Sequence, residues 1–328
     1  MADDSLHQPH DKLFRATFSD PANAAAFLRH PLGSVASSFD WNSLALLSGS
    51  FIDSHMKGSE ADLLFSVNIG GADTLLYILW EHQRNEAPFM ALRLLSYMVR
   101  IWRKQSKKQG STDRLAPILP IVLAQDKNRW KTTTQFHELF AFPEEVQQTA
   151  RACTPDFAFR LLQLVDLAYE DIGGTPEGIL TLRSLKAEPL EELLLNVVWD
   201  REVITGVSPE AVERFFRYVL STNVDKKAFK AKVTELESGN LITIAMTLAE
   251  RFREEGREEA RLESYQKLRS RHIRLVLSVL EVRFGSVPEG LVNTLSSLDD
   301  PDRLERLHET ALRCPDLESF AAELRRDM

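Results

Sequence analysis

Three polar residues between positions 62 and 83 have the types and spacing of a metal-binding site. Asp62 starts one alternating segment, whereas Glu81 and Gln83 end the next segment, two residues apart. Residues i and i+2 of a β-strand lie on one face, so Glu81 and Gln83 would project together. If the two segments form an antiparallel hairpin, Asp62 lies beside the end of the partner strand. The spacing therefore predicts two carboxylates that converge on one point.

Two converging carboxylates suit a hard divalent cation. Mg²⁺ takes oxygen ligands, often one or two carboxylates, keeps several waters and leaves positions for phosphate oxygens. The bound metal lowers the pKa of a water molecule and neutralises charge on a scissile phosphate. Gln83 would orient the attacking water or a phosphate oxygen, although a neutral amide supplies no positive charge. An acidic residue at a strand end can equally be a solvated edge charge, so spacing alone leaves both interpretations open.

The elements that would position these residues form a hairpin. Apolar residues alternate over 61–69, which predicts a half-buried strand. The Gly-Gly-Ala-Asp run at 70–73 predicts a hairpin turn, because glycine tolerates positive φ. Residues 74–83 are apolar on both faces, which is typical of a central strand. Residues 41–52 contain an apolar run that is compatible with a strand or a helix end.

Helices and a further strand surround this hairpin. Residues 11–29 predict two helices, with Asp20 as N-cap and Pro21 at the first helical position of the second. Residues 88–108 have the spacing of a long amphipathic helix, and 117–124 form a compact apolar strand. A strand, turn, strand, helix, strand order implies an α/β fold, a mixed sheet with helices packed on it.

The chain beyond residue 143 is expected to be almost entirely helical. Ser208 and Pro209 suit an N-cap and a first helical position. Residues 242–281 predict a long helix interrupted only by Gly256, with charges of interleaved sign that are typical of a solvated or self-associating helix. We expect four parts: an α/β domain over 1–145, a helical region over 146–250, a charged helix over 251–282, and a small helical unit over 283–328.

Composition limits the class of protein. A chain with 44% hydrophobic and 27% charged residues is typical of a soluble globular protein and excludes disordered or fibrous classes. Cys153 and Cys314 are far apart and give neither a disulfide framework nor a zinc site, which fits a reducing cytosol. The polar N-terminus is no secretory signal, and no apolar run is long enough to cross a membrane. We therefore expect a cytoplasmic protein with no membrane partner.

The net charge of −8 bears on nucleic acid as a partner. Phosphate neutralisation supplies most non-specific affinity for DNA, so a DNA-binding protein is normally basic. If this chain binds DNA, a local basic patch must do so. Composition alone therefore weighs slightly against DNA as the partner.

Several segments resemble the Rpn family of recombination-promoting nucleases, also described as YhgA-like transposases, within the PD-(D/E)XK nuclease superfamily. The likeness covers roughly residues 8–250, and the charged helix and the tail from Leu275 are also typical of these proteins. The segments are His10-Asp11-Lys12-Leu13-Phe14, Asp62-Leu63-Leu64-Phe65, Tyr77 to Gln83, Pro88 to Met98, and Pro120 to Leu123 with Trp130.

The resemblance implies a restriction-endonuclease-like mixed sheet and a metal-dependent DNA endonuclease that uses Mg²⁺, with Mn²⁺ or Ca²⁺ as alternatives. Asp62 would match the metal-binding aspartate and Glu81 the second acidic ligand. Gln83 takes the position that lysine holds in many superfamily members, which is usual within this family. Ala61 replaces the proline of the superfamily's name, a change that removes no ligand. Asp11 would add an acidic group from the first helix.

Basic residues of the 88–108 helix are candidates for DNA contact. Arg93 and Tyr97 lie one helical turn apart and would face the phosphate side, although a salt bridge at the edge of the core explains Arg93 equally well. A cationic cluster follows, and it would either track a DNA backbone or cap the end of the helix, where cations interact favourably with the helix macrodipole. The cluster consists of Arg100, Arg103, Lys104, Lys107 and Lys108. His82 is expected to point away from Glu81 and Gln83, into the fold.

Three hypotheses follow for the function. The first is the endonuclease, acting in recombination, mobile-element movement or phage defence, with a homo-oligomer through the charged helix that would suit double-strand cleavage. The second is a catalytically idle nuclease fold that binds DNA or protein. The third is a helical scaffold without a site, which leaves the hairpin residues unexplained.

Overall fold

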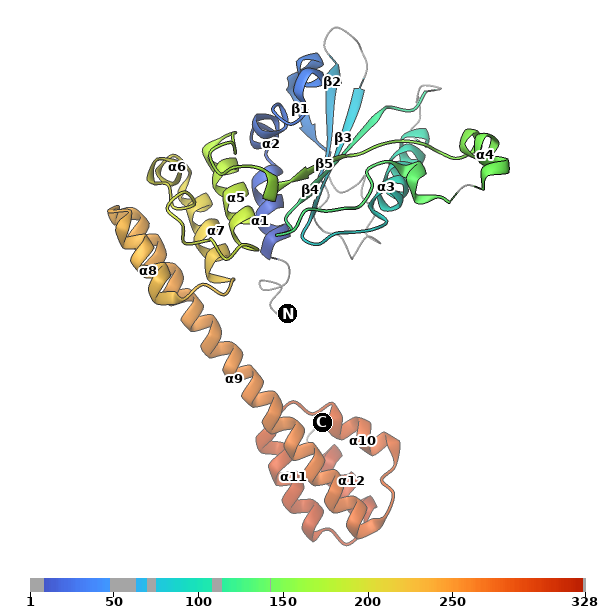
Figure 1. Ribbon diagram of the computed structural model, residues 1–328. Coiled ribbons are helices and arrows are strands. Elements are labelled where there is room, and N and C mark those ends of the chain that lie inside the picture. The colour runs from blue at the N-terminus through green and yellow to red at the C-terminus, as the bar shows by residue number, and fades with distance from the viewer. Residues whose placement is uncertain (1–8, 48–62, 70–74, 108–113, 142, 327–328) are drawn as a thin grey trace. The chain divides into compact units, whose positions relative to one another are not determined.

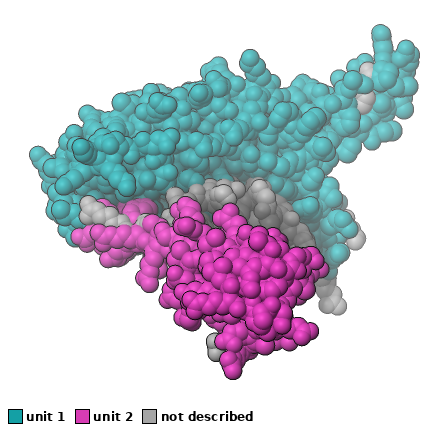
Figure 2. Space-filling model, turned by 90° about the horizontal axis from the view of Figure 1, so that it is seen from below, with its two compact units in different colours: residues 1–246 teal, residues 247–328 magenta. Residues whose placement is uncertain are grey.

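The computed structural model describes residues 9–47, 63–69, 75–107, 114–141 and 143–326. The chain divides into two compact units, residues 1–246 and 247–328, which Figure 2 colours teal and magenta. All of the candidate site residues belong to the first unit. The predicted turn at 70–73, Asp62 and Lys108 lie outside the described residues.

A five-stranded mixed sheet forms the centre of the first unit (Figure 1). The strands lie side by side in chain order, with β1–β2–β3 antiparallel and β3–β4–β5 parallel. This arrangement confirms the predicted α/β class and settles the ambiguous 41–52 segment, whose first half is a strand. The strands are β1 (Phe39–Leu46), β2 (Leu63–Ile69), β3 (Leu75–Gln83), β4 (Ile118–Ala124) and β5 (Arg160–Gln163).

The third strand is central, as its apolar composition predicts. It pairs with β2 up to Trp80, opposite Leu63, and with β4 along its whole second half, where Glu81 lies opposite Val122. Strand β4 pairs with β5 only from Ile121 onward. Because side chains alternate along a strand, Trp80 and His82 point to one face of the sheet and Glu81 and Gln83 to the other.

Helices α1 (Pro9–Phe18) and α2 (Pro21–Leu28) cover the Trp80 face. The ring of Trp80 lies 5.0 Å from that of Phe14 and 4.8 Å from that of Phe18, measured between centroids. Asp20 caps α2 by accepting a 2.8 Å hydrogen bond from the backbone N–H of Ala22, as predicted. Helices α5 (Pro176–Ala187) and α7 (Pro209–Leu220) pack on α1 from the far side.

Helix α3 (Met90–Ser106) covers the opposite face. Its buried residues Met90 and Leu94 belong to one hydrophobic core with Leu64, Leu79 and Val122 of the sheet. The predicted amphipathic helix over 88–108 is thus confirmed. It brings the first turn of α3 over the end of β3.

Further helices complete both units. The long helix α9 runs through Gly256 without the predicted interruption, because one glycine costs only about 1 kcal/mol in a helix interior. Strand β5 lies in a stretch predicted to be almost entirely helical, whereas the four predicted part boundaries stay predictions. The remaining helices are α4 (Gln147–Cys153), α6 (Arg201–Thr205), α8 (Lys226–Glu235), α9 (Gly239–Phe284), α10 (Glu289–Ser296), α11 (Pro301–Arg313) and α12 (Leu317–Arg325).

The second unit has its own hydrophobic core. Val276 and Leu280 of α9 pack there with Leu304, Leu307 and Phe320 of α11 and α12. Across the described part of the chain, no helix is sufficiently long and apolar to span a membrane.

Candidate active site

Glu81 is the most deeply buried acidic residue of the candidate site among those that the structure describes. Its side chain is 0% exposed and lies at the end of β3, on the face covered by α3. The side-chain amide Nε2 of Gln83 donates to Glu81 Oε1 at 2.7 Å. The alternation predicted from the sequence therefore brings Glu81 and Gln83 together on one face.

Arg93 supplies the positive charge beside this carboxylate. Its guanidinium contacts the same Oε1 of Glu81, and its Nη2 lies 3.2 Å from the sulfur of Met90. The side chain is 34% exposed, so it reaches from the protein surface to the buried carboxylate. Of the two interpretations of Arg93, the structure has the salt bridge at the edge of the core. Tyr97, one helical turn later, is buried in the hydrophobic core that α3 forms with the sheet.

The oxygen atoms at this point fit a hard cation in part. The carboxylate of Glu81 and the amide oxygen of Gln83 are the ligand types that Mg²⁺ accepts. Asp62, the other predicted carboxylate, lies outside the described residues. Within the described ranges, no group of three or more histidine, cysteine, aspartate or glutamate side chains is placed to hold a metal ion. A site here therefore needs Asp62 or ligands that come with the substrate.

His82 points to the opposite face, as predicted. Its Nδ1 lies 2.7 Å from Oδ1 of Asp11, and its Nε2 lies 2.8 Å from Oε1 of Gln125. Phe14 stacks on the imidazole at 5.1 Å between ring centroids. Asp11, expected to add an acidic group near the metal, is thus placed on the other side of the sheet from Glu81. Helix α1 covers the Trp80 face, so its carboxylate meets His82.

Gln125 is a site residue that the sequence analysis missed. Its backbone N–H donates to the carbonyl of Gln83 at 2.7 Å, and its side chain bonds to His82. A signal was available, because Gln125 directly follows β4, and the carboxyl ends of parallel strands meet at one edge of a sheet.

A buried polar network continues from Gln125 toward α5 and α7. His10 Nδ1 lies 3.2 Å from Gln125 Nε2 and 3.0 Å from the Tyr218 hydroxyl. Burial lowers the pKa of His10 from 6.5 to about 4, aided by Arg84 and His82 and opposed by Asp11. Burial also raises the pKa of Tyr218.

Glu188 closes the network at the protein surface. It accepts a 2.8 Å hydrogen bond from Arg84, the residue that follows β3. Burial raises the pKa of Glu188, and the neighbouring Arg84 opposes that shift. The sheet, the first helix and the α5–α7 layer are therefore joined by polar contacts on this face.

The exposed face of α3 combines cationic and apolar side chains. Arg100, Arg103 and Lys107 are exposed, and Lys104 is half-buried. Two apolar residues stand out on the same helix, because Leu92 is 49% and Val99 is 41% exposed. Phe89, directly before the helix, is 65% exposed. This surface is therefore not uniformly basic.

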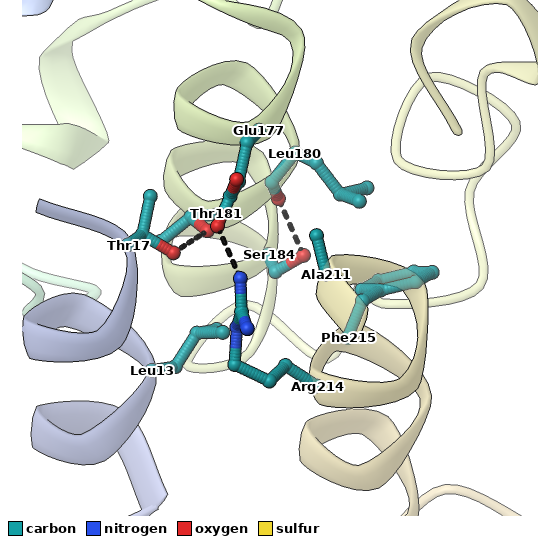
Figure 3. A pocket seen from close by; sticks show the side chains of 9 residues that line it. All are labelled: Leu13, Thr17, Glu177, Leu180, Thr181, Ser184, Ala211, Arg214 and Phe215. Atoms are coloured by element: carbon teal, nitrogen blue, oxygen red, sulfur yellow. Dashed lines mark hydrogen bonds and ion pairs between the residues drawn. The ribbon is translucent and has the colours of Figure 1, made fainter. Parts of the chain in front are cut away.

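A small cavity between α1, α5 and α7 lies apart from Glu81 (Figure 3). The hydroxyl groups of Thr17 and Thr181 are 2.8 Å apart beside it, and Arg214 bonds to Glu177 at 2.5 Å. Ser184 Oγ donates to the carbonyl of Leu180 at 2.6 Å. These bonds between side chains link α1, α5 and α7 and use the polar groups beside the cavity, so the cavity offers no reactive group.

The sequence matches the family described as "Putative transposase, YhgA-like" over residues 8–199. That match spans the sheet, α1 to α5 and the whole candidate site, which is more than half of the chain. The chain therefore belongs to the YhgA-like transposase family, and the resemblance noted from the sequence is confirmed.

Curated relatives carry the name of recombination-promoting nucleases. The chain is 29% identical to RpnC of Escherichia coli K12 over 138 residues, which is 42% of this chain and 45% of RpnC. It is 31% identical to RpnD of Escherichia coli O157:H7 over 124 residues, covering 38% of this chain and 46% of RpnD. The chain thus spans just under half the length of these two relatives.

Another relative matches over most of its length and has a different name. The inactive recombination-promoting nuclease-like protein RpnE of Escherichia coli K12 is 24% identical over 303 residues, 87% of this chain and 93% of RpnE. No solved structure matches the chain. The chain is thus similar to proteins named as nucleases and to a protein named as inactive.

Proposed function

We propose that this chain is a metal-dependent DNA endonuclease whose catalytic residues are Asp62, Glu81 and Gln83. One observation carries the proposal: a fully buried carboxylate, Glu81, lies at the end of a central strand with Gln83 bonded to it. Burying a carboxylate is costly unless charge or hydrogen bonds compensate it, so a hydrophobic residue would serve structure better at this position. The relatives named as nucleases give this site its chemistry.

Glu81 and Asp62 would hold Mg²⁺, and Mn²⁺ or Ca²⁺ would occupy the same oxygen site. The bound metal supplies a water of lowered pKa and neutralises charge on the phosphate. Gln83 orients the attacking water or a phosphate oxygen. Arg93 is 34% exposed, and its guanidinium would bind a phosphate once it leaves Glu81.

DNA is the proposed partner, held along α3. Arg100, Arg103, Lys104 and Lys107, with Lys108 beyond them, would contact the phosphate backbone. The proposal includes a cytoplasmic location and a homo-oligomer formed through the charged helix over residues 251–282. Two active sites in one assembly suit cleavage of both DNA strands.

A catalytically idle nuclease fold is the second candidate. The similarity to a relative named inactive, over 87% of this chain, favours it, and so does the contact of Arg93 with Glu81. In this case the ion pair would be a permanent structural feature. The chain would then bind DNA or protein without cutting.

Plasmid cleavage separates the two candidates. Purified protein should nick supercoiled plasmid with Mg²⁺ or Mn²⁺ and not with EDTA. Glu81→Gln and Asp62→Asn should abolish nicking, because each removes one charged ligand while keeping the side-chain size. Glu86→Gln is the matched control, since Glu86 is exposed and bonds to Thr132 and Lys131.

Each outcome of the cleavage assay bears on one of the two candidate functions. Nicking that survives EDTA or the Glu81→Gln change would contradict the proposed site. A folded wild-type chain that cleaves under no metal would favour the idle nuclease fold. Metal-dependent nicking lost only in the two ligand variants supports the endonuclease.

A further inference from the structure

The residue between Glu81 and Gln83 is buried and has a polar partner at each ring nitrogen. His82 is 1% exposed, with one ring nitrogen 2.7 Å from Asp11 Oδ1 and the other 2.8 Å from Gln125 Oε1. Phe14 stacks on its face. Both ring nitrogens of the imidazole and one of its faces are therefore contacted by two segments of the chain, helix α1 and the residue that follows β4.

Gln125 holds the same strand twice. Its side chain meets His82, and its backbone N–H donates to the carbonyl of Gln83 at 2.7 Å. Gln125 is itself 0% exposed, and its Nε2 bonds onward to His10 and Glu188. The end of β3 is thus tied to α1, to the end of β4 and to α5.

We propose that Asp11, His82 and Gln125 form a clamp that positions Glu81 and Gln83 for cleavage from the opposite face of the sheet. This inference rests on the proposed endonuclease function and adds positioning residues to it. The reason is the alternation of a strand: rotation of the backbone at residue 82 would turn the side chains at 81 and 83 together. Fixing the imidazole of His82 fixes the direction of both.

The clamp gives Asp11 a role that differs from metal binding. On the His82 face, Asp11 acts as a hydrogen-bond partner of the imidazole and not as a metal ligand. A side-chain amide can donate to or accept from a ring nitrogen, so Asn in its place should keep the contact. Residues that orient metal ligands from a distance typically change metal affinity or activity by about 10–100-fold when they are removed. A displacement of about 1 Å at a reacting group has a similar effect on rate.

The test compares two substitutions on the same helix. Asp11→Ala removes the clamp's α1 contact, and Asp11 is suitable because its side chain is 24% exposed, so the variant is less prone to unfold than one at His82. Thr17→Val is the matched control, since it removes the α1 hydrogen bond to Thr181, which does not involve β3. Asp11→Asn keeps an acceptor oxygen without the charge.

Two assays are applied to the full-length protein: plasmid cleavage, and Mg²⁺ binding by calorimetry. Asp11→Ala should lower kcat by about 10–100-fold and weaken Mg²⁺ binding, with the KM for DNA within twofold of the wild type. Thr17→Val and Asp11→Asn should cleave at rates within a few fold of the wild type. Asp11→Ala and Thr17→Val with equal losses would overturn the clamp, because the loss would then follow stability alone. Asp11→Asn as inactive as Asp11→Ala would also overturn it and would assign Asp11 to the charge of the site.

Hydrogen exchange separates failure of the clamp from failure of the proposed function. If the wild-type chain neither cleaves DNA nor binds Mg²⁺, the endonuclease proposal fails, and the backbone amides of residues 81–83 still report on the clamp. Asp11→Ala should accelerate their exchange, and Thr17→Val should not. Unchanged exchange in Asp11→Ala would show that the end of β3 needs no clamp.

Discussion

The ion pair between Arg93 and Glu81 allows a quantitative test through stability. Arg93→Gln leaves the buried carboxylate of Glu81 with the Gln83 amide at 2.7 Å and without its cation. Removing one partner of a fully buried pair costs about 3–5 kcal/mol, and losing an exposed pair costs up to about 1 kcal/mol. With Glu81 at 0% and Arg93 at 34% exposed, we expect a loss of about 2–3 kcal/mol.

Thermal unfolding measures this loss. For a domain of this size, each kcal/mol lowers Tm by about 2–4 °C, so Arg93→Gln should melt roughly 4–12 °C below the wild type. Arg100→Gln is the matched control on the same helix, and its exposed side chain predicts a change within about 0.5 kcal/mol. The double variant Arg93→Gln with Glu81→Gln should be more stable than Arg93→Gln alone, because it also removes the buried charge that Arg93 compensates.

Mg²⁺ extends the same measurement to the proposed metal site. If Glu81 binds the cation, Mg²⁺ replaces the missing guanidinium, and the rise in Tm on adding Mg²⁺ should be larger for Arg93→Gln than for the wild type. An Arg93→Gln variant as stable as Arg100→Gln would refute the energetic importance of the pair. An equal Mg²⁺ response in the wild type and in Arg93→Gln would refute competition between Arg93 and the metal for Glu81.

Two more predictions concern pH and assembly. The pKa of His10 falls from 6.5 to about 4 on folding, so between these pH values the unfolded state binds a proton that the folded state does not. The contribution of His10 to the free energy of unfolding should be fully present above about pH 6.5 and fall by roughly 3 kcal/mol toward pH 4. Denaturant titrations of His10→Gln should show a flatter pH profile, and an unchanged profile would count against the burial of a neutral His10. The charged helix leaves Leu262 53% and Leu268 44% exposed, so sedimentation should give an oligomer for the wild type and a monomer for Leu268→Glu, and a monomeric wild type would remove the oligomer proposal.

The parts of the fold that could be predicted depend on local pattern. The two-residue period placed β2, the apolar composition of residues 74–83 placed β3, and the cap at Asp20 placed α2. The alternation of side chains along a strand set Glu81 and Gln83 on one face. Strand β5 could not be predicted, because four residues of which two are polar give no period to detect. Its place in the sheet depends on β4 as a neighbour.

The contacts of the candidate site lie beyond such patterns. Asp11 and His82 are 71 positions apart in the sequence, and only the packing of α1 on the sheet brings them together. The acidic residue of the first helix was visible in the sequence, whereas the face it covers was not. Arg93 could be placed on the inner side of a helix, but its partner could not be chosen between Glu81 and a phosphate.

Pro120 has a consequence for the backbone hydrogen bonding of β4. The backbone N–H of Tyr77 bonds to the carbonyl of Pro117, and that of Gln125 to the carbonyl of Gln83, so odd-numbered residues of β4 direct these groups to β3. Pro120 therefore faces the other side, at the point just before β5 begins to pair at Ile121. Pro120 is buried, and proline has no N–H, so no backbone donor is left without a strand partner at this point. A buried backbone N–H without a partner would be costly, and proline avoids that cost where β5 has not yet begun.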